Sequence, residues 1–137
     1  MNARAFVDTN VLVYANAAPG DAKSDAARAL LAELWTARRG VVSTQVLQEL
    51  AWVLRRKGRL DGAAVRGAVT PYLAWHVIVN DGAATLRALD VEARFGVSFW
   101  DALIIQAAQA AGAEVLYSED LADGQLYGSV RVSNPFA

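Results

Sequence analysis

Apolar and polar residues follow one another along this chain in blocks that are typical of strands connected by helices. Short apolar runs, several of them rich in valine, predict buried strands at 5–7, 41–43, 75–79, 115–118 and 130–132. Longer segments carry apolar residues at the three- and four-residue spacing of one helix face, and they predict helices at 10–16, 24–39, 44–57, 61–70, 81–95 and 98–111. This alternation favours an α/β fold, with a mainly parallel sheet of about five strands covered by helices on both faces.

Glycine and proline mark the expected ends of these elements. Glycines are predicted to end the helices that precede them, at Gly40, Gly58, Gly96 and Gly112. A Pro-Gly pair predicts a loop over 17–21, and Pro71 stops the helix at 61–70. No internal repeat, low-complexity tract or linker divides the sequence, so we expect a single domain over residues 1–137.

The composition predicts a globular, soluble chain without thiol chemistry. Of 137 residues, 55% are hydrophobic and 20% are charged, and the absence of cysteine leaves oxygen atoms as the expected metal ligands. No apolar run approaches the ~18 to 20 residues that cross a bilayer, and the polar start at 1–4 differs from a signal peptide. We therefore expect a cytoplasmic protein that does not bind membranes. Because the net charge is −1, binding of nucleic acid requires a local basic patch.

Two acidic side chains follow strands of the predicted sheet. Asp8 interrupts the first apolar block directly after 5–7, and Asp120 comes just after 115–118. Ligands of open parallel sheets bind beyond the carboxyl ends of the strands. If the first and fourth strands are neighbours, Asp8 and Asp120 meet at that edge although they are far apart in the sequence.

Two further acids lie on predicted helices. Glu49 is on the flank of the apolar stripe of 44–57, and Asp101 is in the first turn of 98–111. Four carboxylates in one cleft would repel one another and raise one another's pKa unless a cation lay among them. One or two Mg²⁺ or Mn²⁺ ions suit such a site, and a pair of them can promote displacement at a phosphodiester. With one histidine and no cysteine, a histidine base or a thiol nucleophile has little support.

Each acid also has an ordinary structural explanation. Asp8 can cap a helix, and Asp101 belongs to a segment, 98–101, that fits a capping box with Asp in place of Glu. Glu49 can be a helix-flank acid paired with an arginine, and Asp120 can be a turn residue. The joint placement of the four acids, rather than any single one, indicates a site. His76 lacks a second histidine at ligand spacing, so we expect it to be structural.

Four motifs, in order along the chain, resemble those of the PIN-domain ribonucleases, and within that family the VapC-type toxins of bacterial toxin-antitoxin pairs. They are FVDTNVLVY at 6–14, STQVLQEL at 43–50, FWDALI at 99–104 and YSEDLADG at 117–124. The resemblance covers nearly the whole chain. It implies a three-layer α/β/α sandwich and an endoribonuclease that depends on Mg²⁺ or Mn²⁺.

The resemblance also implies a set of site residues. Carried over by position, the catalytic and metal-binding acids are Asp8, Glu49, Asp101 and Asp120. Asn10 and Ser118 would be supporting polar groups that orient ligands or water, and Asp123 would be an outer ligand in the same loop as Glu119 and Asp120.

Partners follow from the resemblance as well. It implies an RNA substrate, a homodimer, and inhibition by a cognate antitoxin whose C-terminal segment crosses the active-site groove. Trp52, Arg56 and Trp100 lie close to the proposed acids in the sequence, and we expect some of them to contact RNA or the antitoxin.

Two other functions are compatible with the sequence. One is a non-catalytic PIN-like module that binds RNA or protein without cutting. The other is a phosphatase that uses Asp8 as a covalent nucleophile, which has less support because Asn10 stands where a D-x-D arrangement needs a second Asp.

Overall fold

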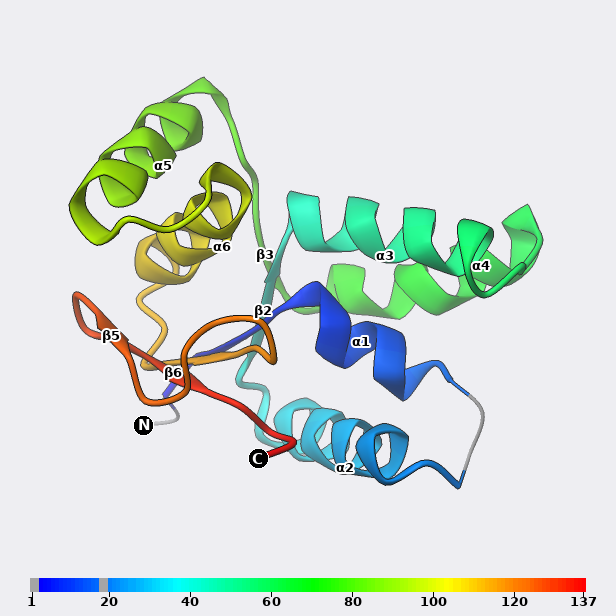
Figure 1. Cartoon of the computed structure of the whole chain (residues 1–137). Coiled ribbons are helices and arrows are strands. Elements are labelled where there is room, and N and C mark those ends of the chain that lie inside the picture. Colours follow the sequence, from blue (N-terminus) through cyan, green and yellow to red (C-terminus); the bar gives the residue numbers. More distant parts are fainter. Residues whose placement is uncertain (1–2, 18–19) are drawn as a thin grey trace.

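A computed structural model of the chain describes residues 3–17 and 20–137. Residues 18 and 19 of the predicted loop at 17–21, and the first two residues of the polar start, lie outside the described residues. The centre of the structure is one six-stranded sheet in the order β3-β2-β1-β4-β6-β5 (Figure 1). Its strands are β1 (Ala5–Val7), β2 (Gly40–Ser43), β3 (His76–Ile78), β4 (Val115–Tyr117), β5 (Leu126–Tyr127) and β6 (Val130–Ser133).

Helices cover both faces of this sheet, as expected for a three-layer α/β/α sandwich. They are α1 (Thr9–Ala15), α2 (Ala22–Ala37), α3 (Thr44–Arg56), α4 (Gly62–Val69), α5 (Gly82–Phe95) and α6 (Phe99–Ala110), with a 3₁₀ helix η1 (Thr70–Ala74) after α4. Helices α5 and α6 pack together on one side of the sheet, and α1 to α4 lie on the other side (Figure 1). The predicted fold class is confirmed.

The core lies where the central strands meet these helices. All three residues of β1 are fully buried, and so are Leu116 of β4 and Ile105 of α6. A strand covered on both faces reads as a continuous apolar run, which is why the short block at 5–7 predicted it correctly.

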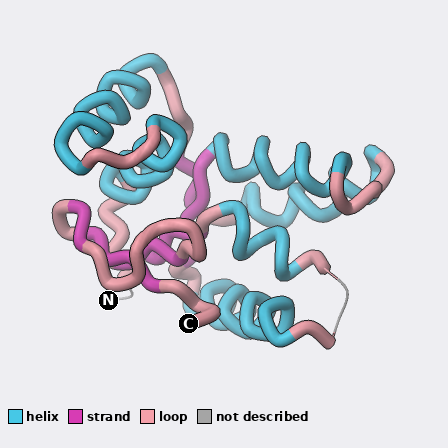
Figure 2. Tube along the Cα trace, viewed as in Figure 1, coloured by secondary structure: helices cyan, strands magenta, loops and turns pink. Residues whose placement is uncertain are grey.

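Strand pairing brings the carboxyl ends of the parallel strands to one edge. Every pair is parallel except β5 with β6. Each of β1, β2 and β4 is followed at this edge by a helix or loop, and the loop after β4 passes beside the first turn of α1 (Figure 2). The edge therefore collects side chains from distant parts of the sequence.

Two sequence predictions differ from the structure. The sheet has six strands rather than about five, because the two-residue strand β5 is too short to give an apolar pattern. Gly40 does not end α2: the helix ends at Ala37, Arg38 takes the left-handed conformation (φ 56°), and Gly40 begins β2. Gly96 and Gly112, by contrast, have the positive φ expected after α5 and α6.

Gly40 is required by close packing rather than by a turn. A Cβ atom built at this position would lie 2.5 Å from the Cδ2 atom of the Trp75 indole. That ring packs edge-on against Trp35 and Tyr72, with centroids 5.3 and 5.2 Å away. Only a residue without a side chain allows the indole to lie against β2.

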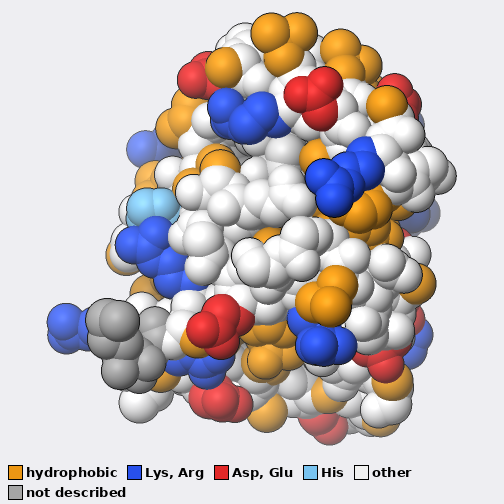
Figure 3. Space-filling model, turned by 90° about the vertical axis from the view of Figure 1, so that its left-hand side faces the viewer, with side chains coloured by type: hydrophobic (Ala, Val, Ile, Leu, Met, Phe, Trp, Pro, Cys, Tyr) orange, Lys and Arg blue, Asp and Glu red, His pale blue; other side chains and the backbone are white. Residues whose placement is uncertain are grey.

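The surface carries charges of both signs. On the face drawn in Figure 3, basic and acidic side chains are interspersed, and the chain's one histidine lies beside basic side chains. Within the described residues, no helix is both long and apolar enough to span a membrane.

Candidate active site

Asp8 occupies the carboxyl edge of the sheet, at the point where β1 becomes α1. Strand β1 pairs with β4, with Val7 opposite Tyr117, and the Asp8 N–H donates to the Tyr117 carbonyl at 2.9 Å. The side chain is 7% exposed and caps α1, since its Oδ1 accepts the Thr9 N–H at 2.7 Å. The capping role predicted for Asp8 is confirmed, and it leaves the carboxylate facing the site.

The charge of Asp8 is unfavourable where it lies. The pKa of its carboxyl is raised to about 6, chiefly by burial and to a smaller extent by the charges of Asp120 and Glu49, although the hydrogen bonds from the Ser118 hydroxyl and the Thr9 N–H lower it. The Ser118 Oγ donates to Asp8 Oδ2 at 2.8 Å. Removal from water is therefore the main reason that the charge of Asp8 is unfavourable.

Asp120 is held beside Asp8 by two polar neighbours. The Asn10 amide donates to Asp120 Oδ2 at 2.9 Å, and the Asp120 N–H donates to Ser118 Oγ at 3.1 Å. Ser118 therefore contacts both acids, and Asn10 connects α1 to the loop after β4. This placement agrees with the supporting roles proposed for Asn10 and Ser118.

Glu49 enters the site from α3, through a contact that no sequence pattern indicated. The Thr9 hydroxyl donates to Glu49 Oε1 at 2.8 Å, which ties the second turn of α3 to the first residue of α1. Thr9 follows Asp8 directly, so this bond places the Glu49 carboxylate within electrostatic range of Asp8. Thr9 could not have been singled out, because its residue type also suits a helix start.

The three acids of the loop after β4 have different neighbours. Glu119 forms an ion pair with Lys23, which lowers the pKa of its carboxyl. Asp123 accepts the Asn134 N–H at 2.8 Å and so anchors the C-terminal segment. Asp120 is thus the acid of this loop whose charge acts on Asp8, and its role as the fourth site acid stays a prediction.

Asp101 stands apart from the other three acids. It lies in the first turn of α6, where its N–H donates to the Ser98 hydroxyl at 3.1 Å, as the capping pattern predicted. Burial raises the pKa of the Tyr127 hydroxyl and the charge of Asp101 adds to that shift, whereas Asp101 is not among the charges that act on Asp8. The same turn is linked to α3, because the Gln45 amide donates to the Trp100 carbonyl at 3.4 Å.

The donor set suits a hard divalent cation. The charges of Glu49 and Asp120 both act on Asp8, and Mg²⁺ and Mn²⁺ prefer carboxylate oxygens as ligands. Within the described ranges, no three acidic, histidine or cysteine side chains are arranged as a metal-binding group. Each of these carboxylates accepts a hydrogen bond from a hydroxyl or amide donor. The residues therefore fit the ion by the chemistry of their oxygen atoms.

An exposed aromatic and basic surface borders the acids. Trp52 is 58% exposed and Trp100 66% exposed, and the Arg56 guanidinium lies 4.9 Å from the centre of the Trp52 ring. Trp52 and Arg56 follow Glu49 at one and two turns of α3. Neither tryptophan belongs to the core, so both are free to contact a ligand at this edge.

This fold and arrangement of acids define a nuclease-like α/β domain, and comparison identifies its family. Residues 5–122 match the PIN domain, so the chain belongs to the PIN-domain family, whose members are ribonucleases. Twelve chains of solved structure match, among them Mycobacterium tuberculosis VapC20, described as a Sarcin-Ricin loop cleaving toxin. The TM-score is 0.66 at 24% identity, over 85% of this chain and 89% of that chain, which establishes a shared fold. No curated protein matches. The predicted resemblance to the PIN-domain family is confirmed.

Proposed function

We propose that this chain is a Mg²⁺- or Mn²⁺-dependent endoribonuclease and the toxin of a toxin-antitoxin pair. The observation that carries the proposal is the convergence of Asp8, Glu49 and Asp120, with the pKa of Asp8 raised to about 6. Membership of the PIN-domain family and the fold shared with VapC20 support RNA as the substrate. Asp101 completes the acidic set in this proposal, because it stands in the family motif at 99–104.

The chemistry proposed is hydrolysis of a phosphodiester bond. The oxygen of water forms a bond to phosphorus while the bond from phosphorus to the 3′-oxygen breaks, which leaves a 5′-phosphate and a 3′-hydroxyl. A divalent cation held by Asp8, Asp101, Asp120 and Glu49 supplies positive charge for the phosphate and a more acidic water. Asp8 is fixed by Thr9 and Ser118, Asp120 by Asn10, and Glu49 by the Thr9 hydroxyl, from which it can orient the water.

Partner binding is proposed at the same edge. The exposed Trp52, Arg56 and Trp100 provide stacking surfaces and positive charge for RNA, or for the segment of a cognate antitoxin that covers the acids. A homodimer is part of the proposal, and size-exclusion chromatography with light scattering tests it directly.

The test is cleavage of total RNA, and of a sarcin-ricin loop oligonucleotide, by the purified protein without an antitoxin. Reactions contain Mg²⁺, Mn²⁺ or EDTA, and Asp8→Asn and Asp101→Asn are compared with the wild type. Asp90→Asn is the matched control, because Asp90 is an exposed acid on α5 that is not one of the proposed site acids. We expect discrete RNA fragments that form only when the metal is present. They should be absent with the two site variants and present with the control.

Other outcomes decide against the proposal. A folded, metal-loaded protein that binds RNA and cuts none of these substrates would favour a binding module. A covalent phospho-aspartate at Asp8 would favour the phosphatase. Cleavage that persists in both site variants would show that these acids do not carry the reaction.

A further inference from the structure

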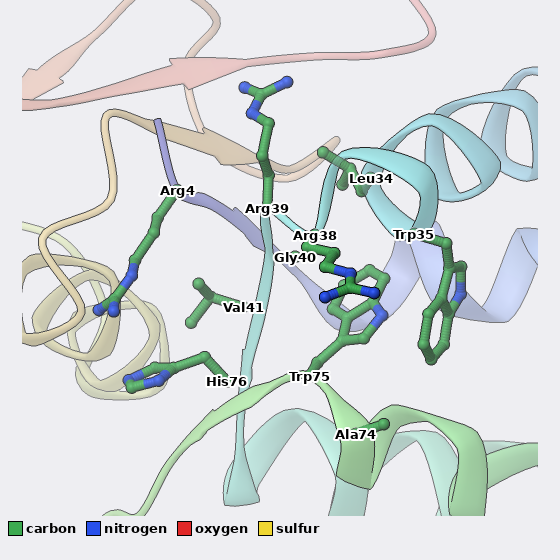
Figure 4. Close-up of a pocket in the computed structure, with 10 residues that line it drawn as sticks. All are labelled: Arg4, Leu34, Trp35, Arg38, Arg39, Gly40, Val41, Ala74, Trp75 and His76. Carbon is green, nitrogen blue, oxygen red and sulfur yellow. The ribbon is translucent and has the colours of Figure 1, made fainter. Parts of the chain in front are cut away.

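A cavity lies at the opposite edge of the sheet from the acids. It has a volume of about 430 Å³ and is lined by residues at the amino ends of β1, β2 and β3 and at the end of α2 (Figure 4). Arg4 precedes β1, whereas Asp8 follows it, and four residues of extended chain span roughly 13 Å. The cavity is therefore separate from the candidate active site, and its volume falls within the range of about 300–1,000 Å³ that is usual for small-molecule sites.

The lining of this cavity is basic. Arg4, Arg38, Arg39 and His76 line it, and no acidic side chain of the described residues does. Arg39 has a carboxylate 3.7 Å away, from the exposed Glu33, whereas neither Arg4 nor Arg38 forms an ion pair with any described residue. Arginine, whose planar guanidinium can bind two oxygens at once, is suited to phosphate. The cavity thus provides positive charge for an anion.

Two tryptophans supply the remaining walls. Trp35 is 38% exposed, and its ring lies 5.3 Å from that of Trp75. Trp75 is 8% exposed, and its buried Nε1 has no hydrogen-bond partner among the described residues. A buried donor without a partner is costly, so a ligand that supplied an acceptor here would relieve that cost. Figure 4 shows Arg4 and His76 towards one end of the cavity and Trp35 towards the other.

We propose that this cavity binds a phosphorylated nucleoside, with its phosphate at the arginines and its base against the exposed ring of Trp35. The two kinds of lining match the two parts of such a ligand, since aromatic side chains stack on bases of any sequence and arginine binds phosphate oxygens. The ligand is either a free nucleotide or the 5′-terminal nucleotide of an RNA strand. The site does not depend on nuclease activity.

The experiment measures binding by calorimetry to the Asp8→Asn protein in EDTA, so that neither cleavage nor metal contributes. The ligands are the four nucleoside 5′-monophosphates, inorganic phosphate, a nucleoside, and a short 5′-phosphorylated RNA. Arg38→Gly, added to this background, removes the guanidinium and suits the positive φ at this position. Arg4→Gln, which keeps a donor for the Ala111 carbonyl, is the second variant. We expect each to weaken monophosphate binding about tenfold or more.

The matched control is Arg59→Gly. Arg59 is the other non-glycine residue with a positive φ (54°) among those described, so the substitution makes the same chemical and conformational change away from the cavity. Unchanged monophosphate affinity in this variant is the expected result. Three results would overturn the proposal. Arg59→Gly could weaken monophosphate binding as much as Arg38→Gly does, or no monophosphate could bind at millimolar concentration. Inorganic phosphate could also bind as tightly as the monophosphates do.

Binding of the 5′-phosphorylated RNA distinguishes the two sources of the ligand. Tighter binding of the 5′-phosphorylated RNA than of the monophosphates, lost in Arg38→Gly, would support an RNA end as the ligand. Weaker binding of the RNA, with monophosphate binding retained, would support a free nucleotide.

Discussion

Asp8 is a carboxylate buried among hydrogen-bond donors, with two further carboxylates acting on it. For the metal-free protein, its charge opposes folding, because the folded state binds a proton on this group more tightly than the unfolded state does. A neutral side chain could cap α1 without this cost. The cost of the Asp8 charge is therefore consistent with the metal-binding role that we propose for this residue.

The pH dependence of stability follows from this shift. The pKa of Asp8 rises from 3.8 to about 6 on folding, so the free energy of unfolding should fall as the pH rises from 4 to 6. Two pKa units correspond to about 3 kcal/mol, and this deficit should remain at higher pH. In EDTA, Asp8→Asn should not show this fall in the free energy of unfolding, and it should be more stable than the wild type at pH 7.5. Urea unfolding at pH 4.5 and 7.5 measures both proteins.

Asp90→Asn provides the comparison for this pH dependence. Its carboxylate is exposed, so this variant should keep the wild-type difference between the two pH values. If Asp8→Asn showed the same pH dependence as the wild type, the Asp8 carboxyl would not titrate in the way that its burial implies.

Thr9 should affect activity through Glu49. Thr9→Val keeps the shape of a buried side chain but removes the hydroxyl that donates to Glu49 Oε1. We expect RNA cleavage to fall about 10- to 100-fold, the usual effect of removing a group that orients a ligand, with the fold preserved. Thr9→Ser keeps the hydroxyl and should retain most of the activity. Initial rates of RNA cleavage measure this effect, and circular dichroism checks the fold. An equal loss of activity in both variants would assign Thr9 to packing instead.

Among the elements, the pair β2 and β3 depends on one glycine. Gly40→Ala would put a Cβ atom 2.5 Å from the Trp75 indole, which is packed against other aromatic rings. We expect a loss of about 1–3 kcal/mol in the free energy of unfolding, typical of overpacking. Gly67→Ala is the control: this glycine lies within α4 with open space around it, and alanine there should stabilise by up to ~1 kcal/mol. A neutral Gly40→Ala in urea unfolding would contradict the packing argument.

The elements themselves show which patterns a sequence can reveal. Strand β1 and the acid after it were predictable, because an apolar block ends abruptly at a polar residue. Arg38 was not, because its left-handed φ is rare for a residue with a side chain and is imposed by the turn between α2 and β2. The contact of Thr9 with Glu49 joins residues 40 positions apart, and such pairs are decided by packing rather than by local sequence.

At the scale of the whole molecule, the order of the strands in the sheet determines which side chains lie together at the site. Asp8 and Asp120 meet because β1 and β4 are neighbours, although the residues of the Asn10–Asp120 bond are 110 positions apart. The sequence predicted this meeting only on the condition that the two strands pair, which the structure fulfils. The basic cavity at the other edge was not predicted, since its arginines and tryptophans share no motif and are assembled by the same topology.

Because the site exists only in the folded chain, metal binding should stabilise the whole molecule. A ligand at about 100 times its Kd adds roughly 2.7 kcal/mol to the free energy of unfolding. Mg²⁺ or Mn²⁺ should therefore raise the Tm of the wild type at pH 8. The increase should be smaller at pH 5, where the Asp8 carboxyl, with its pKa of about 6, is largely protonated and competes with the ion.

The same measurement of Tm on variants shows which residue is responsible for the stabilisation by metal. Asp8→Asn should gain little from either metal at pH 8, whereas Asp90→Asn should gain as much as the wild type. An equal gain in Asp8→Asn would place the ion elsewhere, because a carboxylate that holds a cation cannot be replaced by an amide without loss of affinity. The readout needs no RNA, so it tests the acids as ligands independently of cleavage. It also connects the residue with the molecule, since the charge that destabilises the metal-free chain at Asp8 is the one that a bound ion would neutralise.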